Sequence, residues 1–214
     1  MYFPKTNFAA DSLLITLHTL RIMTNEEILS IFKSSGALLE GHFRLTSGLH
    51  SSQYFQCARV LQYPKHSEQL CTQIAEHFRS QNITLVISPA IGGIVVGQEV
   101  GRLLGVRTIF AERESGEMKI RRGFEIFPDD KILICEDVIT TGGSVREVYD
   151  LLSKQGSNVA GIASIVDRSN GKASFPVPYF SLLAMEVVAH QPETCPMCAN
   201  GIPVIKPGSR EVPK

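Results

Sequence analysis

Two adjacent carboxylates, Glu136 and Asp137, stand two residues before a run of hydroxyl-bearing residues and glycines at 140–144. Carboxylates accept hydrogen bonds from vicinal hydroxyl groups, whereas the run offers backbone N–H and side-chain O–H donors to an anion. Residue types in this order predict a ligand with ribose hydroxyls at one end and a 5′-phosphate at the other. A Walker loop is excluded, because no Gly-Lys-Ser/Thr follows.

The flanking segments indicate how these groups are positioned. Residues 132–135 are a continuous apolar run, which is typical of a parallel strand covered on both faces. Ser144 and Glu147 have the spacing of a capping box, and the following helix has one apolar face made of Val145, Val148, Tyr149 and Leu152. The phosphate would then face the positive end of a helix. The alternative is an ordinary turn, with the acids as a solvated strand end.

Strands alternate with helices along much of the chain. Strands are expected at 84–88, 106–111, 132–135 and 159–166, and helices at 24–34, 64–78, 94–104 and from 144. This order predicts an α/β fold with a doubly wound, mostly parallel sheet flanked by helices. Ligands bind such sheets outside the carboxyl ends of the strands, where four loops are expected at 89–93, 112–123, 136–144 and 167–171.

The segment 136–144, Glu-Asp-Val-Ile-Thr-Thr-Gly-Gly-Ser, resembles the 5-phosphoribosyl-1-pyrophosphate (PRPP) motif of type I phosphoribosyltransferases. Three other stretches resemble orotate phosphoribosyltransferases: Thr-Ser-Gly at 46–48 with Ser51 and later aromatics, Asp-Arg-Ser-Asn-Gly at 167–171, and Cys-Pro-x-Cys at 195–198. The resemblance runs from about residue 24 to the C-terminus. It implies a glycosyltransferase that makes orotidine 5′-monophosphate and pyrophosphate from orotate and PRPP in pyrimidine biosynthesis.

The resemblance implies that PRPP lies between the motif and the loop at 89–93. Many family members carry a lysine where this chain has Gly92, so Mg²⁺, held mainly by PRPP and water rather than by the protein, is expected to neutralise the pyrophosphate. Gly92 and Gly93 supply backbone that can take positive φ and approach the anion closely, although a plain glycine turn is the alternative. The residues expected to bind PRPP are Ala90, Ile91, Gly92, Gly93, Arg113, Lys119, Glu136, Asp137, Val138, Ile139, Thr140, Thr141, Gly142, Gly143 and Ser144.

The loop at 112–123 is polar and contains glycine, as mobile lids often do. In the resembled family a basic lid closes over PRPP, partly from the neighbouring subunit, which implies a homodimer. Arg113 looks like its leading arginine, and Lys119 is a candidate for pyrophosphate contact, with Arg121 and Arg122. Glu114 departs from the family pattern, and a solvated charged loop is the alternative. The expected catalytic residues are Arg113, Lys119, Glu136 and Asp137.

Arg168 follows a predicted strand, and a guanidinium suits bidentate pairing with a planar carboxylate. The resemblance assigns it to orotate, together with Thr140, Tyr54 and Phe55. An ion pair with Asp167 is the alternative. Many relatives carry a lysine where this chain has Thr46.

The two cysteines Cys195 and Cys198 have the spacing of half a structural zinc site. No second Cys-x-x-Cys and no histidine pair with ligand spacing accompanies them, which favours reduced thiols over a metal. Five scattered cysteines in 214 residues do not make a disulfide framework, so a cytoplasmic protein is expected.

Composition limits the remaining classes of protein. Lysine and arginine total 21, as do aspartate and glutamate, which disfavours a nucleic-acid partner. No apolar run reaches the ~20 residues of a membrane span.

Residues 1–22 are expected to be a dispensable extension, with an organelle transit peptide as the alternative, because Thr24 and Glu27 predict a capping box after Met23. Residues 23–214 are expected to form one domain, with a hood at about 23–60 plus the C-terminal tail and a core at about 64–190.

Two other functions share parts of this pattern. A type I phosphoribosyltransferase acting on a purine would keep the PRPP motif but lack the Thr-Ser-Gly and Asp-Arg-Ser-Asn-Gly segments. A non-catalytic regulator that senses PRPP would need a separate DNA-binding domain or a basic RNA-binding face, and neither the length nor the charge provides one.

Overall fold

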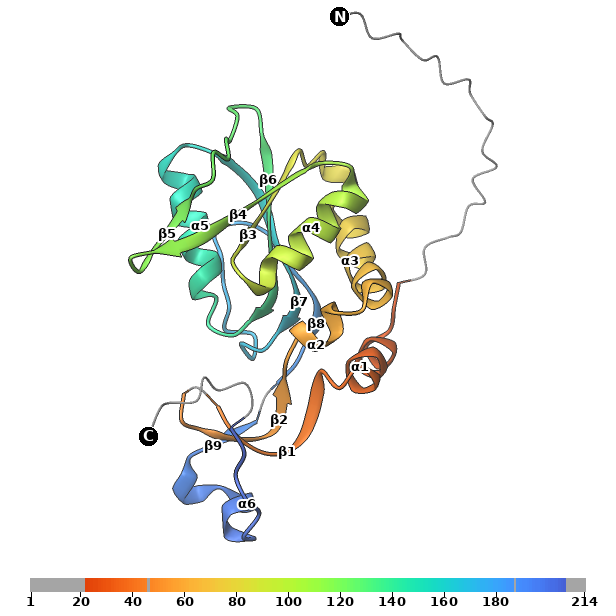
Figure 1. Ribbon diagram of the computed structural model, residues 1–214, viewed down its shortest axis with the longest axis vertical. Helices are drawn as coiled ribbons and strands as arrows, with labels where there is room; N and C mark the ends of the chain where they lie inside the picture. Colours follow the sequence, from red (N-terminus) through yellow and green to blue (C-terminus); the bar gives the residue numbers. More distant parts are fainter. Residues whose placement is uncertain (1–21, 46, 187, 207–214) are drawn as a thin grey trace, which may run out of the picture.

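A computed structural model describes residues 22–45, 47–186 and 188–206. Most of the extension expected at 1–22, and Thr46, lie outside the described residues. An α/β core forms one end of the molecule, and a small sheet with the C-terminal tail forms the other (Figure 1). No described helix combines the length and apolarity needed to cross a membrane.

The core sheet has six strands in the order β5-β4-β3-β6-β7-β8. All neighbours are parallel except β4 and β5, so the predicted mostly parallel α/β sheet is confirmed. The strands are β3 (Leu85–Pro89), β4 (Arg107–Glu114), β5 (Glu117–Ile120), β6 (Lys131–Ile139), β7 (Asn158–Asp167) and β8 (Tyr179–Ala184). Strand β8 was not among the expected elements; it lies at the sheet edge, and most of its residues are only half-buried.

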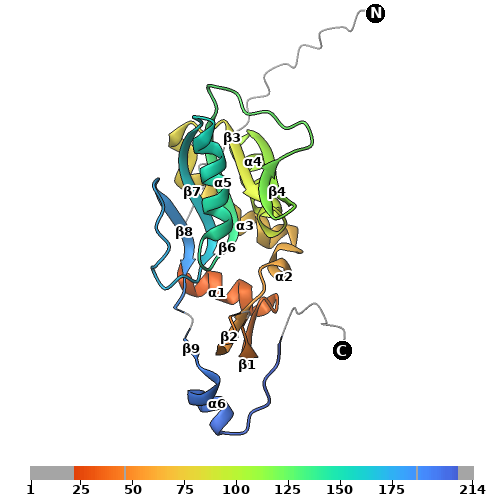
Figure 2. The ribbon, with the colours of Figure 1, turned by 90° about the vertical axis from the view of Figure 1, so that its left-hand side faces the viewer.

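Helices cover both faces of this sheet (Figure 2). One face packs against α3 (Pro64–Phe78) and α4 (Gly92–Leu104), and the other against α5 (Gly143–Lys154). Alternate residues of β6 divide between these two cores, since Leu133 and Cys135 join the first and Ile132 and Ile134 the second. The continuous apolar run is therefore buried on both sides, as predicted. Short helices α2 (Ala58–Leu61) and η1 (Arg79–Gln81) flank α3.

The polar segment expected as a loop at 112–123 is largely a β-hairpin. Strand β4 continues to Glu114, and β5 pairs with it in antiparallel register across a tight turn. Ser115 and Gly116 make that turn with positive φ values of 53° and 88°. The loop prediction was wrong here because alternating charged and apolar side chains suit a half-exposed hairpin as well as a loop.

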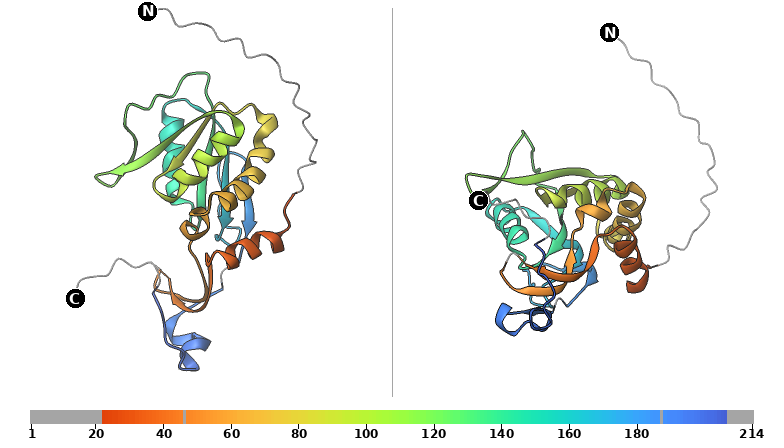
Figure 3. Two further views of the ribbon diagram at one scale, coloured as in Figure 1. Left: turned by 45° about the vertical axis from the view of Figure 1, so that its right-hand side comes forward. Right: turned by 60° about the horizontal axis from the view of Figure 1, so that its bottom comes forward.

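We use the name hood for the second sheet together with the C-terminal tail. Unlike the hood expected at about 23–60, it does not include the first helix. Its strands are β1 (Leu38–Arg44), β2 (His50–Phe55) and β9 (Ala189–His190), in the order β1-β2-β9, and the tail continues through η2 (Pro192–Thr194) and α6 (Pro196–Ala199). Segments from opposite ends of the sequence thus lie side by side (Figure 3). The hood is joined to α1 (Asn25–Ser34), where Thr24 and Glu27 form the predicted capping box.

Candidate active site

The carboxyl ends of β3 and β6 lie next to each other at the centre of the core sheet. After β3 the chain adds β4 on one side, and it later returns to build β6, β7 and β8 on the other side. Such a switch in strand order leaves a crevice between the loops that follow the two strands. The acid pair lies near the end of β6 and therefore at this crevice.

Glu136 and Asp137 are held by their own backbone. Asp137 N donates to Glu136 Oε1 at 3.1 Å, and Val138 N donates to Asp137 Oδ1 at 2.8 Å. Glu136 is 9% exposed, and this burial, with the neighbouring charge of Asp137, raises its pKa to about 9. At neutral pH the Glu136 carboxyl therefore keeps its proton until a ligand binds.

Both carboxyl groups lie against the first residues of α4, although neighbouring strand residues normally point to opposite faces. A Cβ atom built on Gly93 would stand 2.8 Å from Glu136 Oε1, and one built on Gly92 would collide with the Asp137 carboxylate. Neither glycine makes use of positive φ. The absence of a side chain at these positions leaves room for the acids, and a lysine at position 92 would have to displace Asp137.

A cavity of about 240 Å³ lies over the N-terminus of α5. Gly142 precedes the helix with a φ of +77°, a conformation that favours glycine. The cavity therefore has the form of an anion cradle at a positive helix end. It is lined by Arg113, Glu136, Val138, Ile139, Thr140, Thr141, Gly142, Gly143, Ser144, Val145 and Glu147.

The capping box predicted for Ser144 and Glu147 does not form. Gly142, not Ser144, is the N-cap, and a glycine has no side chain to cap the helix. Glu147 Oε1 instead accepts a hydrogen bond from Arg113 Nη2 at 2.7 Å. The spacing was misleading because the glycine starts the helix earlier, where Gly143 N donates to Thr141 Oγ1 at 3.4 Å.

A second cavity, of about 600 Å³, lies where the hood meets the core. Its lining includes the four residues expected to contact the base: Tyr54, Phe55, Thr140 and Arg168. Thr140 and Thr141 line both cavities, so the two adjoin. The sequence did not single out the remaining wall residues, which are Leu45, Ser47, Leu49, Thr141, Ser169, Asn170, Lys172 and Ala189, as contacts of the base.

Arg168 is a half-buried cation with an unused donor. Its Nε is buried and has no hydrogen-bond partner among the described residues, and its guanidinium carbon lies 5.9 Å from the centre of the Phe55 ring. Burial lowers the pKa of Arg168, but an arginine starts so high that it stays charged. Within the described part of the chain, Arg168 forms no ion pair with Asp167, whose Oδ1 accepts from Ser169 N at 2.7 Å. An anionic ligand would satisfy this donor.

The basic residues of the β4–β5 hairpin pair mainly with its own acids. Lys119 Nζ lies 3.2 Å from Glu114 Oε2, and Arg121 Nη2 lies 2.9 Å from Glu114 Oε1. Arg122 pairs with Glu112, also at 2.9 Å. Of the expected lid residues Arg113, Lys119, Arg121 and Arg122, the cradle includes Arg113 alone. Lys119 is thus not brought to the cradle in this arrangement.

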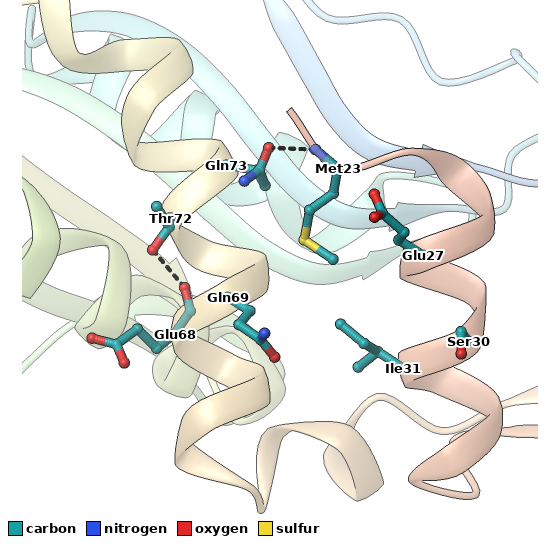
Figure 4. A pocket seen from close by; sticks show the side chains of 8 residues that line it. All are labelled: Met23, Glu27, Ser30, Ile31, Glu68, Gln69, Thr72 and Gln73. Carbon is teal, nitrogen blue, oxygen red and sulfur yellow. Dashed lines mark hydrogen bonds between the residues drawn. The ribbon is translucent and has the colours of Figure 1, made fainter. Parts of the chain in front are cut away.

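A third cavity, of about 530 Å³, lies between α1 and α3 (Figure 4). Met23 N donates to Gln73 Oε1 at 3.1 Å across it. None of its lining residues belongs to a loop that follows a core strand, and none is a basic side chain that could bind a phosphate or carboxylate. Its lining is Met23, Glu27, Ser30, Ile31, Glu68, Gln69, Thr72 and Gln73.

The structure also places two histidines beside the cysteine pair of the tail. The ligand atoms of His42, His50, Cys195 and Cys198 all lie within 4.8 Å of one another. The interpretation that the other half of a metal-binding set is missing was therefore wrong. Its only sequence signal was a histidine on each strand of one hairpin, which has no regular ligand spacing.

Comparisons with known proteins agree with this arrangement. Residues 59–192 match the family described as the phosphoribosyl transferase domain. The orotate phosphoribosyltransferase of Chlorobaculum parvum is 63% identical over 88% of this chain and 97% of its own length. That of Pelotomaculum thermopropionicum is 56% identical over 89% of this chain and 100% of its own length.

Solved structures show the same fold. The orotate phosphoribosyltransferase of Aeropyrum pernix superposes with a TM-score of 0.61 at 24% identity, over 74% of this chain and 93% of its own. An adenine phosphoribosyltransferase from Thermoanaerobacter pseudethanolicus superposes with a TM-score of 0.55 at 17% identity, over 62% and 88% of the two chains. The fold alone therefore does not select the base.

Proposed function

The chain belongs to the orotate phosphoribosyltransferase family, and we propose that its two adjoining cavities bind the two substrates of that reaction. The reaction transfers the 5-phosphoribosyl group of PRPP to a ring nitrogen of orotate, and it yields orotidine 5′-monophosphate and pyrophosphate for pyrimidine biosynthesis. One observation carries the substrate assignment: the base cavity and the phosphate cradle share Thr140 and Thr141 beside the acid pair. A base and a ribose phosphate bound there would meet at the anomeric carbon.

The cradle is assigned to the 5′-phosphate and the acid pair to the ribose hydroxyls. Backbone N–H groups and hydroxyls of 140–144 would donate to the phosphate, and the positive end of α5 adds to its stabilisation. The carboxyl oxygens of Glu136 and Asp137 would accept from the ribose hydroxyls. Pyrophosphate is assigned to the neighbouring loop at 89–93, which ends against the same carboxyl groups.

The base cavity is assigned to orotate. Arg168 supplies a guanidinium whose Nε lacks a partner, and the orotate carboxylate has the charge and planarity to pair with it. Tyr54 and Phe55 offer aromatic surface to the planar base.

The chemical step breaks the bond between the anomeric carbon and the pyrophosphate oxygen, and the electron pair leaves on the oxygen. The orotate ring nitrogen gives up its proton to pyrophosphate or water and donates an electron pair to the same carbon, so no protein nucleophile is required. Positive charge develops on the ribose ring between these events. Asp137 places a carboxylate near that charge and stabilises it, because a preorganised charge in a partly buried site acts more strongly than one in water.

Magnesium fits the residues around this site. Mg²⁺ prefers oxygen ligands and keeps several waters, and the acid pair offers carboxyl oxygens. Burial and then the nearby charge of Asp137 raise the pKa of Glu136, and a cation would offset both effects. Glu136 and Asp137 would hold the ion through its water shell and the substrate, with no direct protein ligand required. When bound, it would neutralise charge on the pyrophosphate.

We also propose a cytosolic homodimer in which the β4–β5 hairpin serves the partner's site. The proposal rests on Lys119, which lies outside the cradle of its own chain, and on the exposed turn at the hairpin tip. Mixing Lys119→Ala and Asp137→Asn dimers under conditions that exchange subunits tests it. Heterodimers would regain one complete site, so an equal mixture should reach about a quarter of wild-type activity. No recovery would contradict the shared site.

A direct assay tests the substrate assignment. The purified protein should consume orotate and release pyrophosphate only when both PRPP and Mg²⁺ are present. Adenine and hypoxanthine serve as control bases, because a purine enzyme would share the PRPP site but prefer them. Turnover of a purine but not of orotate would contradict the base assignment. PRPP binding without product from any base would instead indicate a regulator.

A further inference from the structure

Four side chains of the hood, His42, His50, Cys195 and Cys198, direct their nitrogen and sulfur atoms toward one point; we call them the hood cluster. Three are buried, with exposed fractions of 2% for His42, 6% for His50 and 2% for Cys195, whereas Cys198 is exposed. None of them lines either of the two cavities assigned to substrates. The reaction proposed above therefore leaves these residues without a role.

Four of the six separations within the cluster lie within about 0.4 Å of the edges of a zinc tetrahedron, and the other two are no longer than 4.8 Å. Bond lengths of about 2.0–2.1 Å to nitrogen and about 2.3 Å to sulfur put two ligand nitrogens about 3.3 Å apart and a nitrogen and a sulfur about 3.6 Å apart. His42 Nε2 and His50 Nδ1 are 2.9 Å apart. The nitrogen–sulfur separations are 3.5 Å (Cys195 to His42), 3.7 Å (Cys198 to His42) and 3.2 Å (Cys198 to His50).

Hydrogen bonding alone does not satisfy this cluster. His42 Nδ1 lies 2.7 Å from the carbonyl oxygen of Ile202, and a carbonyl only accepts, so Nδ1 carries the proton. In a neutral imidazole, Nε2 then has a lone pair directed at the cluster. His50 Nδ1, Cys195 Sγ and Cys198 Sγ all lie close to that single lone pair. One cation bound between the four side chains would interact with a lone pair from each of them. A backbone carbonyl that fixes the tautomer is also a common partner of a metal-binding histidine.

Local structure places each of the four side chains. Between the pairs Glu40–Gln53 and Phe43–Ser51, strand β1 has two residues where β2 has one, which is a β-bulge. The bulge turns His42 inward next to the buried Phe43. His50 begins β2, and the two cysteines lie at the start and within the single turn of α6.

We propose that the hood cluster binds one Zn²⁺ in a closed structural site. Two thiolates and two imidazoles in tetrahedral arrangement are a donor set that selects zinc over hard cations such as Mg²⁺. Four protein ligands leave no position for substrate or water, so the ion is structural rather than catalytic.

The ion would fasten the C-terminal tail to the wall of the base cavity. The tail reaches the hood at β9, which pairs with β2, and again at Ile205, which exchanges backbone hydrogen bonds with His42 and Arg44. Strand β9 has only two residues, and a small sheet of this kind buries little apolar surface. Ala189 of β9 also lines the base cavity, so the ion would hold that wall in place.

Metal content tests the proposal without any assay of activity. Protein purified under reducing conditions, without chelators or a metal-affinity tag, should contain about one zinc per chain by mass spectrometry. Cys198→Ser and His50→Asn should each lose most of it. Cys71→Ala and His66→Asn, which remove a thiol and an imidazole outside the cluster, should keep it.

Cobalt gives a second measurement that does not depend on the folding of a variant. Replacing the metal in the wild-type protein with Co²⁺ should produce the visible bands of a tetrahedral site with thiolate charge transfer. Those bands should be absent from Cys198→Ser, whose exposed side chain is expected to tolerate the change. Wild-type protein that contains no zinc and takes up neither Zn²⁺ nor Co²⁺ when reduced would overturn the proposal. So would metal content equal in the cluster variants and the controls.

Discussion

The cradle at the end of β6 and the hood differ in how the chain assembles them. The cradle and its acid pair come mostly from nine consecutive residues, 136–144, and much of the cradle is backbone. The base cavity combines side chains from residues 45–55, 140–141, 168–172 and 189, and the hood cluster combines residues 42, 50, 195 and 198. Local chain geometry thus builds the phosphate site, whereas tertiary packing builds the base site. Changes near the acid pair should affect every base substrate alike, and changes in the base cavity should affect orotate selectively.

Asp137→Asn should have the largest effect. The substitution keeps the volume but removes the charge expected to stabilise the ribose cation, so kcat should fall about 10²–10³-fold. Steady-state kinetics measure this, with Asp150→Asn on the exposed side of α5 as the control. Unchanged turnover in a folded Asp137→Asn protein would remove the acid pair from the mechanism.

Gly92→Ala should act through the same carboxylate. The added methyl group collides with Asp137 and must displace it, and a displacement of about 1 Å can cost about 10²-fold in rate. Val95→Ala, a partly exposed position on the same helix, should change little.

A double-mutant cycle identifies the cause of the Gly92 effect. If displacement of Asp137 is responsible, Gly92→Ala should cost much less in a protein that already carries Asp137→Asn. Equal losses in both backgrounds would mean that the glycine serves the pyrophosphate directly.

Arg168→Ala tests the base cavity, which tertiary packing builds. Loss of hydrogen bonds to a charged group costs about 1.5–3 kcal/mol, so KM for orotate should rise about 10–100-fold while KM for PRPP changes little. Arg168→Lys should restore only part of the affinity, because an ammonium lacks the bidentate fork. Arg79→Ala, at an exposed arginine, is the control. A larger effect on PRPP than on orotate would contradict the assignment of Arg168.

The difference between local chain geometry and tertiary packing also explains which features the sequence could predict. The buried strand, the glycine turn and helix α3 were predictable, because apolar periodicity, Pro64 and Gly142 act within a few residues. The capping box at Thr24 and Glu27 forms, but the one at Ser144 and Glu147 does not. Gly142 starts that helix earlier, and Glu147 pairs with Arg113 of strand β4. Identical spacing therefore gave opposite outcomes, because a nearby glycine and a distant partner changed the second setting.

Features that depend on distant residues were missed or misjudged. The role of Gly92 depends on a carboxylate 45 positions away in the sequence, whereas the sequence indicated only close approach to an anion. His42 and His50 approach the cysteines only because the tail returns to the hood, and a β-bulge turns His42 inward. Neither the tail's path nor the bulge has a sequence signal as clear as the PRPP motif.

The smallest expected effect concerns the protonation of Glu136. Its carboxyl keeps a proton up to about pH 9 in the folded, ligand-free protein, against an ordinary pKa of 4.5. The folded state thus binds more protons than the unfolded state between these values. Its contribution to the free energy of unfolding is fully present below the lower value and is lost as the pH rises, with a slope of at most about 1.4 kcal/mol per pH unit.

Urea unfolding at several pH values between the two limits measures this slope. Glu136→Gln, which is neutral in both states, should remove that part of the pH dependence, whereas Glu40→Gln, at an exposed position, should leave it unchanged. The effect should also disappear when PRPP and Mg²⁺ saturate the site, because bound hydroxyls and a cation favour the ionised carboxylate. An identical slope in wild type and Glu136→Gln would mean that the acid pair is already ionised before the sugar arrives.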